Sequence, residues 1–379
     1  MCVYIIGFLI SLILIWISQN KVKSKKSKIA LMILAVVPIF IISAFRYDVG
    51  EDYIKRYTND YLNLAQGKDV DNLEIGFKII DYICLIFTKE PYILFIITSF
   101  IILSVVYETI FRKSSNKLIS IMIFFLGGFF FASLNLVRQY MAIAFILIGY
   151  QFLLSHNKIK AYVGFLICGI IAFLMHSSSI ICFIMIFLNR KVIVDIKWVL
   201  PLSAIIILLN ENIMKILEPI IEKTRFDVYL SGKFAKGEFS ALNIVENLIV
   251  YLWMYGVYLF NKKRNLKLEK EGILFLNIQG IAFLVTIAGT IHMQFLRIAI
   301  YFWIFQILSI PYFLSLMPLD YITLKINNRL KKDFKSKNIK IVAYAVIIIG
   351  FMLIFGYTNI LNNDNKVIPY KTVFSIDRE

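Results

Sequence analysis

The sequence predicts an all-α, polytopic membrane protein, and its composition, the length of its apolar blocks and its charge distribution all favour this class. Of 379 residues, 60% are hydrophobic and the mean hydropathy is +0.77, whereas soluble proteins are usually about 45–50% apolar. The apolar residues form blocks near the roughly 20 residues that a spanning helix needs, and short runs of Lys and Arg separate them. We therefore expect one transmembrane domain over residues 1–358 and a short extracytoplasmic tail over 359–379.

The blocks predict about 12 transmembrane helices. They are 2–18, 29–45, 91–110, 118–136, 139–155, 161–176, 179–189, 196–210, 243–260, 272–290, 298–317 and 341–358. The first block is a retained helix rather than a signal peptide, because its lysines follow the apolar stretch instead of preceding it. The block 179–189 is too short to cross alone. Residues 75–88 are apolar but interrupted by Lys78 and Asp81, which favours a re-entrant or interfacial helix.

The distribution of charge predicts the orientation. With the loop 21–28 placed in the cytoplasm, the cytoplasmic loops hold 25 Lys and Arg against about 5 acidic residues, and the opposite face holds 16 against 18. This is the positive-inside pattern, so the net charge of +17 reports topology and does not indicate binding to nucleic acid. The same map makes 46–90 and 211–242 large extracytoplasmic loops, and loops of this length often act as lids or binding elements.

The densest polar feature follows the second span. Arg46, Asp48 and Asp52 lie within seven residues of one another, and such a group can provide a general base, a phosphate ligand or a metal site. Tyr53 and Tyr57 would share one face if this stretch is helical. The alternative is a solvated loop with interfacial tyrosines.

Two further polar positions interrupt apolar stretches at the same predicted face. Arg138 lies within the long apolar run 119–154, where an arginine is costly and usually faces a cavity or a partner; a guanidinium also binds phosphate in a bidentate manner. His176 ends the span 161–176, and histidine side chains titrate near neutral pH. The alternatives are a snorkelling boundary arginine and a structural histidine.

His292 and Arg297 fall between the spans 272–290 and 298–317, again at the predicted outer face. Arg297 has the same alternative interpretation, an arginine that opens a helix at the boundary. None of the four cysteines has the spacing of a metal site. Three arginines near one headgroup depth, with carboxylates and a histidine, indicate an anionic substrate held at the lipid–water boundary.

At these residues the chain resembles the EpsG family, which is related to Wzy-type polysaccharide polymerases. The resemblance rests on Arg46-x-Asp48-x-Gly50-x-Asp52-Tyr53-x-x-x-Tyr57, Glu74-Ile75-Gly76-Phe77, Asn135-x-x-Arg138-Gln139 and His176-Ser177-Ser178. Family members often have proline where this chain has Ile75, a departure that concerns loop geometry more than chemistry. The motifs cover roughly residues 1–188, and the spans with Arg297 continue the resemblance to about 357.

The resemblance implies polymerisation of undecaprenyl-pyrophosphate-linked oligosaccharide repeat units into exopolysaccharide or capsule, at the outer leaflet of a bacterial cytoplasmic membrane. Its expected partners are this lipid-linked substrate, the bilayer, a chain-length regulator and a flippase. The resulting hypothesis assigns pyrophosphate binding to Arg138, Arg297 and then Arg46. Asp52, Asp48 and His176 compete as the base that accepts the acceptor's proton, and Tyr53 and Tyr57 would stack on sugar rings. The hypothesis requires no metal or other cofactor.

Other classes remain open at this point. A transporter or flippase of lipid-linked oligosaccharide would use the same arginines without a base. A membrane O-acyltransferase would use His176 from the cytoplasmic side, whereas the predicted topology places it outside. A ligase that transfers finished polymer shares the polymerase chemistry, and a purely structural scaffold would leave the one-sided polar residues unexplained.

Overall fold

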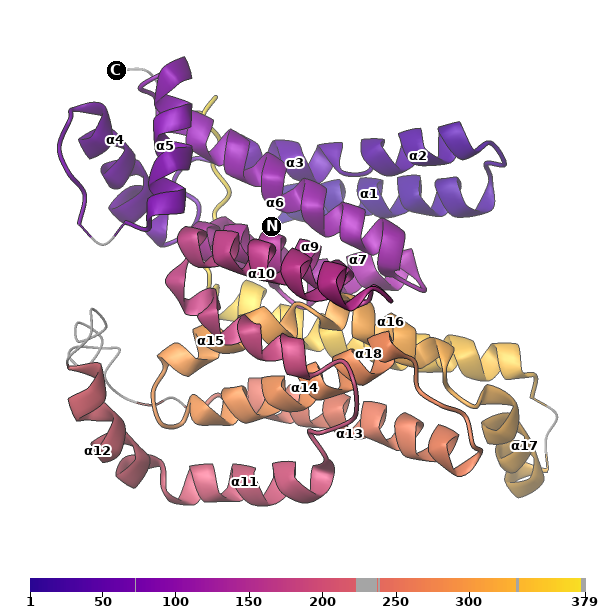
Figure 1. The fold of residues 1–379 in the computed structure, drawn as a ribbon. Coiled ribbons are helices and arrows are strands. Elements are labelled where there is room, and N and C mark those ends of the chain that lie inside the picture. Colours follow the sequence, from indigo (N-terminus) through magenta and orange to yellow (C-terminus); the bar gives the residue numbers. More distant parts are fainter. Residues whose placement is uncertain (72, 223–236, 238, 332–333, 376–379) are drawn as a thin grey trace. The chain divides into compact units, whose positions relative to one another are not determined.

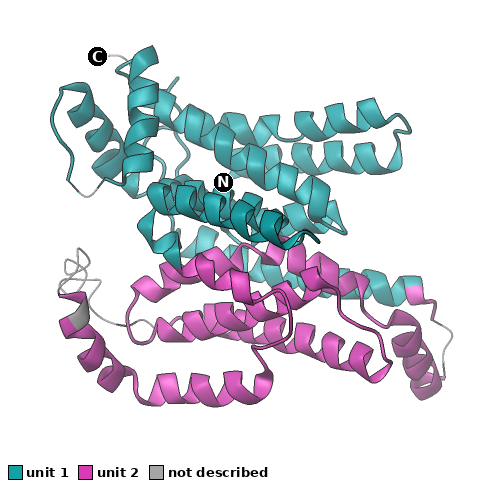
Figure 2. Ribbon diagram, in the orientation of Figure 1, with its two compact units in different colours: residues 1–180, 337–379 teal, residues 181–336 magenta. Residues whose placement is uncertain are grey.

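The computed structural model describes the chain except residues 72, 223–236, 238, 332–333 and 376–379. The described residues are helical, as expected, and contain no strand, only an isolated bridge between Arg46 and Thr372. Part of the expected loop 211–242 therefore lies outside the described residues. The chain divides into two compact units (Figure 2), unit 1 with residues 1–180 and 337–379 and unit 2 with residues 181–336. Each unit is described by itself.

Unit 1 is a bundle of helices (Figure 1). In chain order they are α1 (Cys2–Asn20), α2 (Lys25–Leu34), α3 (Val37–Ala44), the π-helical turn η1 (Tyr53–Thr58), α4 (Asn59–Ala65), α5 (Ile75–Phe87), α6 (Tyr92–Lys113), α7 (Lys117–Leu126), α8 (Phe129–Asn135), α9 (Val137–Leu153), α10 (Lys158–Met175), α18 (Ser336–Phe355) and the π-helical turn η5 (Gly356–Leu361). Helix α9 is buried along most of its length and packs against α6 and α10. Helix α5 packs against α4, α6 and α10.

Unit 2 holds most of the 3₁₀ helix η2 and the helices that follow it. They are η2 (Ser177–Phe187), α11 (Ile196–Leu208), α12 (Asn210–Ile221), α13 (Ala241–Lys263), α14 (Lys270–Ala288), α15 (Gln294–Trp303), α16 (Gln306–Ser315) and α17 (Leu319–Leu330). Buried amides join three of them. The side-chain nitrogens of Gln279 and Gln306 both donate to Oδ1 of Asn247, at 3.0 and 3.3 Å. These bonds tie α14 and α16 to α13, because a buried amide needs a partner.

The structure does not confirm the expected number of 12 spans. Among the described residues, seven helices are long and apolar enough to cross a membrane, or up to ten if each of three bent helix pairs is one span. Two of the bends fall inside the expected spans 118–136 and 298–317, and the third lies at the end of the expected span 196–210, where α12 continues into the expected loop. The expected span 118–136 is α7 and α8, which meet at 50°. Gly128 lies at this bend with φ +78°, a left-handed conformation that favours glycine.

Helix α5 matches the expected helix at 75–88. With 13 residues it is about 20 Å long at 1.5 Å per residue, shorter than a bilayer core of about 30 Å. Its buried face contains Gly76, Phe77, Asp81 and Cys84. Large apolar side chains such as Ile86 and Phe87 are exposed on the other side. An amphipathic helix of this length suits an interfacial position better than a crossing.

Candidate functional site

The site begins at a break in the long apolar stretch 119–154. Helix α8 ends at Asn135, Leu136 separates the helices, and α9 begins at Val137. Arg138 is therefore the second residue of α9, and its side chain is 6% exposed. The break sets this arginine at a helix start inside unit 1 rather than in the middle of a continuous helix.

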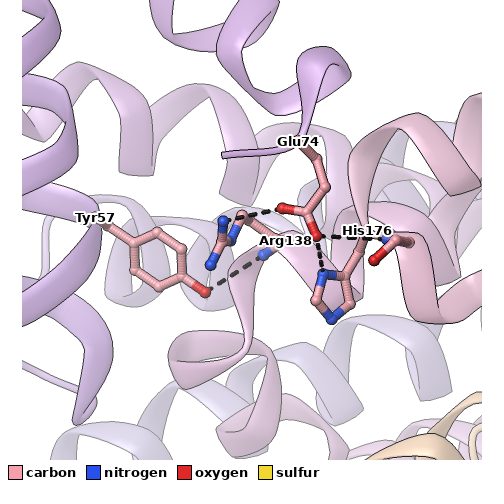
Figure 3. A network of polar contacts seen from close by, with 5 residues as sticks. Tyr57, Glu74, Arg138 and His176 are labelled. Atoms are coloured by element: carbon pink, nitrogen blue, oxygen red, sulfur yellow. Dashed lines mark hydrogen bonds and ion pairs between the residues drawn. The ribbon is translucent and has the colours of Figure 1, made fainter. Parts of the chain in front are cut away.

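One carboxylate joins Arg138 to His176. Oε2 of Glu74 accepts a hydrogen bond from Nη1 of Arg138 at 2.9 Å, and Oε1 lies 2.9 Å from Nδ1 of His176 (Figure 3). The backbone N–H of Ser177 also points to Oε1, at 3.4 Å. Glu74 immediately precedes α5, and His176 immediately follows α10. Three segments far apart in the sequence thus meet at one carboxyl group.

The electrostatics keep Glu74 ionised. Burial by itself would raise the pKa of the Glu74 carboxyl, but the hydrogen bond with His176 and the positive charge of Arg138 outweigh burial and lower that pKa to about 2. The side chain of Glu74 is 9% exposed, and that of His176 is 28% exposed. His176 is therefore the most accessible member of the trio, while the ion pair beneath it is buried.

Gly76 explains how α5 approaches α10 so closely. A Cβ atom on Gly76 would lie 2.8 Å from the backbone carbonyl carbon and oxygen of Leu174, closer than side chains tolerate. The absent side chain lets the start of α5 lie against the end of α10, which brings Glu74 to His176. The motif Glu74-Ile75-Gly76-Phe77 did not by itself indicate a role for Glu74, because its partners lie 64 and 102 positions away in the sequence.

The two tyrosines expected to stack on sugars are buried. Tyr53 and Tyr57 do lie on one helical turn and are 3% and 4% exposed. The ring of Tyr53 stacks on Phe95 with centroids 3.9 Å apart. The hydroxyl of Tyr57 lies 3.5 Å from the backbone N–H of Arg138 and can accept its hydrogen bond (Figure 3). Neither ring presents an exposed face to a sugar in this structure, and both help to position the polypeptide around Arg138.

Arg46 is also buried, at 1% exposure. Its guanidinium donates to the carbonyl oxygen of Ser43 and, at 3.1 Å, to that of Leu134, and it lies 4.7 Å from the ring centroid of Phe95. Leu134 is in the last turn of α8, just before the break. These contacts give Arg46 an evident structural task, which makes Arg138 the better candidate for binding an anion.

The acidic loop after Arg46 lies beside the same break. Asp48 has φ +50° and Gly50 has φ +102°, so the loop turns sharply. The backbone N–H of Asp52 donates to Oδ1 of Asn135 at 3.1 Å. The carboxylate of Asp48 pairs with Lys371 at 3.2 Å, whereas that of Asp52 makes no ion pair among the described residues.

Asp81 is a further acidic side chain near the site that the sequence analysis did not single out for chemistry. It is 1% exposed, and neither carboxyl oxygen has a hydrogen-bond partner among the described residues. Burial raises the pKa of the Asp81 carboxyl to about 8, and the charge of Asp60 adds to the rise while Arg138 opposes it. Asp81 is therefore held neutral near pH 7.

His292 and Arg297 belong to unit 2, so they are placed only within that unit. His292 is buried at 5% exposure, and its Nδ1 accepts the backbone N–H of Gln294 at 3.2 Å. Arg297 lies on α15. Within the described part of the chain, no group of three His, Cys, Asp or Glu side chains is arranged to hold a metal ion.

The comparisons with known proteins identify the family of the chain. A family model described as "EpsG family" matches residues 28–372, a range that contains Arg46, Glu74, Arg138, His176 and Arg297. No curated protein and no solved structure matches the chain. The match covers nearly the whole sequence, and the long apolar helices indicate a multi-pass membrane protein. On this evidence the chain belongs to the EpsG family.

Proposed function

We propose that this chain is a membrane-embedded glycosyltransferase that polymerises undecaprenyl-pyrophosphate-linked oligosaccharide repeat units into exopolysaccharide or capsule. The reaction would occur at the outer leaflet of a bacterial cytoplasmic membrane. Membership of the EpsG family, which is of the Wzy-like polymerase type, supports a polysaccharide polymerase. The observation that carries the chemistry is the Glu74 carboxylate between Arg138 and His176, because it joins a phosphate ligand to a candidate base.

The proposed reaction exchanges one bond for another. The hydroxyl oxygen of a lipid-linked acceptor forms a bond to the anomeric carbon of the donor sugar. The bond from that carbon to the pyrophosphate oxygen breaks, and its electron pair leaves with the lipid pyrophosphate. The leaving group is already a weak base, so it needs stabilising positive charge more than a proton. Arg138 supplies this charge in the proposal, and Arg297 is its second candidate.

His176 is the base that the geometry favours. An ionised Glu74 can only accept a hydrogen bond, so Nδ1 of His176 must carry the proton that it donates to Oε1. In the neutral imidazole, this leaves the lone pair of Nε2 to take the acceptor's proton. Glu74 is then a positioning residue that fixes the tautomer and the ring orientation. Asp52 remains the alternative base, and Asp48 is less suited because Lys371 engages its carboxylate.

Reconstitution tests this proposal. Purified protein in liposomes, supplied with lipid-linked repeat units and no energy source, should yield a ladder of longer lipid-linked glycans. His176→Ala should abolish the ladder. His156→Ala is the matched control, because His156 is exposed at the other end of α9 and α10 and should leave the ladder intact.

The alternatives give different results in this assay and in cells. A transporter would move lipid-linked units between leaflets without lengthening them. A gene deletion should leave single lipid-linked units on the outer leaflet if the protein is a polymerase. Accumulation on the inner leaflet instead would contradict the proposed function and favour a flippase.

A further inference from the structure

The C-terminal segment 363–375 forms a strap over the acidic loop that precedes the site. The backbone N–H of Tyr47 donates to the carbonyl oxygen of Lys371 at 2.9 Å, that of Val373 to Phe45 at 3.0 Å, and that of Gly50 to Lys366 at 3.1 Å. These bonds surround the bridge between Arg46 and Thr372. The segment therefore pairs with the loop over its length instead of touching it once.

The strap is itself anchored in unit 1. The side chain of Asn363 accepts the backbone N–H of Val367 at 2.9 Å and donates to the carbonyl oxygen of Ile368 at 2.8 Å. The hydroxyl of Tyr4 donates to the carbonyl oxygen of Val367 at 2.9 Å, and Val367 is fully buried. The hydroxyl of Tyr370 donates to the carbonyl oxygen of Ile42 at 3.1 Å. Because the strap is bonded both to the helices of unit 1 and to the loop, it can hold the loop in a fixed position.

Two lysines of the strap neutralise two of the loop's three acids. Nζ of Lys366 lies 2.9 Å from Oε1 of Glu51, and Nζ of Lys371 lies 3.2 Å from Oδ2 of Asp48. These side chains are 28–58% exposed, so each pair contributes only about 0–1 kcal/mol to stability. Their larger effect is on charge, because Asp52 is left as the loop carboxylate without an ion-pair partner in the described chain.

The loop in turn contacts the break before Arg138. A Cβ atom on Gly50 would lie 3.0 Å from the carbonyl oxygen of Leu134, so the two backbones nearly touch. The backbone N–H of Asp52 is bonded to Asn135 at 3.1 Å. Asn135 and Arg138 are separated by only two residues. A displacement of the loop would therefore move the start of α9 and the guanidinium that it carries.

We propose that the strap is a working part of the site, with Lys366 and Lys371 as positioning residues for the polymerisation reaction. The two lysines fix the loop against the start of α9 and neutralise Glu51 and Asp48. The carboxylate of Asp52 is then left to accept hydrogen bonds from the hydroxyl groups of the acceptor saccharide. This inference rests on the proposed function. It adds to that function a carboxylate for the acceptor, Asp52, and the strap that leaves this carboxylate without an ion pair.

Charge reversal and its rescue test the inference. Lys371→Glu combined with Lys366→Glu should reduce the rate of glycan lengthening at least ~10-fold, since displacements near 1 Å can cost up to about 100-fold. Adding Asp48→Lys and Glu51→Lys should restore most of the rate, because the ion pairs re-form with opposite polarity. Lys68→Glu is the matched control, an exposed lysine of the same loop region without a side-chain partner in the described structure, and it should be neutral.

Two outcomes would overturn the inference. One is full activity of the double variant with both lysines reversed; the other is no rescue by the quadruple variant when its melting temperature matches that of the wild type. A separate measurement does not depend on activity. Asp48→Cys with Lys371→Cys should cross-link under a short bifunctional reagent, whereas Lys68→Cys with Lys371→Cys should not. Cross-linking of this pair, together with a wild-type protein that fails to lengthen glycans, would reject the polymerase proposal and leave the strap geometry standing, while absent cross-linking would reject the strap.

Discussion

At the scale of single residues, Glu74 is the connecting group of the site. Its carboxylate pairs with a buried guanidinium on one oxygen and with an imidazole on the other. In the proposed mechanism this shared carboxylate links anion binding to proton transfer, because a change at Arg138 would alter the charge that Glu74 presents to His176. Loss of a residue that orients a reacting group can lower the rate by up to about 100-fold, because a misplacement near 1 Å is enough.

Glu74→Gln should therefore reduce glycan lengthening by about 100-fold and lower thermal stability. It removes the carboxylate that pairs with the buried guanidinium of Arg138, and removing one partner of a buried ion pair typically costs about 3–5 kcal/mol. Adding Arg138→Gln should restore melting temperature but not activity, which separates the structural cost from the chemical one. A stable and fully active Glu74→Gln protein would show that Glu74 has no role in the site.

Arg138→Lys tests whether the anion contact needs a guanidinium. Lysine keeps the charge but cannot form the paired hydrogen bonds of a planar fork, so polymer yield and length should fall clearly. Arg112→Lys is the matched control, because Arg112 pairs with Glu108 on the exposed end of α6. Unchanged polymer from Arg138→Lys would exclude a bidentate clamp.

The buried carboxyl group of Asp81 should make the stability of the fold depend on pH. Its raised pKa means that the folded protein holds the carboxyl neutral up to about pH 8, whereas the unfolded chain ionises near 3.8. The resulting stability is fully present below about pH 4 and is lost as the pH rises towards 8. Asp81→Asn removes this dependence, so the variant's free energy of unfolding should gain about 1.4 kcal/mol on that of the wild type for each pH unit between 4 and 8, as measured from melting curves at a series of pH values. Parallel melting curves over this range would contradict the buried neutral acid.

At the scale of elements, the site depends on where helices begin and end. Glu74 precedes α5, His176 follows α10, and Arg138 opens α9. Helix ends carry polar backbone groups without intrahelical partners, so they suit polar side chains better than helix interiors do. The N–H of Ser177 at Glu74 is one such group.

Gly76→Ala should disturb this meeting of helix ends. The added Cβ would meet the backbone of Leu174 at 2.8 Å, and backbone cannot rotate away, so α5 must move from α10. We expect a loss of about 1–3 kcal/mol in stability together with a marked loss of lengthening. Gly350→Ala, in helix α18 with open space around the position, should change neither property; equal effects of the two substitutions would rule out the close approach.

The sequence predicted the positions of the long helices better than the bends that interrupt them. Apolar blocks located nearly every long helix, because burial in a bilayer demands runs of apolar residues. The bends at Gly128 and after Trp303 were not predicted, since the chain is apolar on both sides of each. The third bend, after Leu208, lies where the expected span ended, and the helix α12 that follows it was not predicted because its residues are more polar. Arg138 and His176 were found because they are rare polar residues in apolar surroundings. Glu74 was given no role, because its partners are distant in sequence, and the burial of Tyr53 and Tyr57 depends on packing against residues such as Phe95.

At the scale of the whole molecule, the two ends of the chain converge within unit 1. Residues near the N-terminus, such as Tyr4, bond to the strap, and the strap bonds to the loop 45–51. The charge-based topology had placed the tail 359–379 and the loop 46–90 on one face, and their direct pairing is consistent with that assignment. Unit 2 contains Arg297, whose role in the proposal stays a prediction.

The pairing of Arg138 with Glu74 also has a consequence for turnover. Glu74 is a resident counter-ion for the guanidinium of Arg138, so a free monovalent anion such as chloride has to compete with it. In the proposed reaction, an incoming lipid pyrophosphate would bring several negative charges and would be held at the membrane, so it would displace this single carboxylate. After the sugar has been transferred, the Glu74 carboxylate would pair with Arg138 again and displace the lipid pyrophosphate product. The same carboxylate would thereby provide both selectivity for the substrate and release of the product.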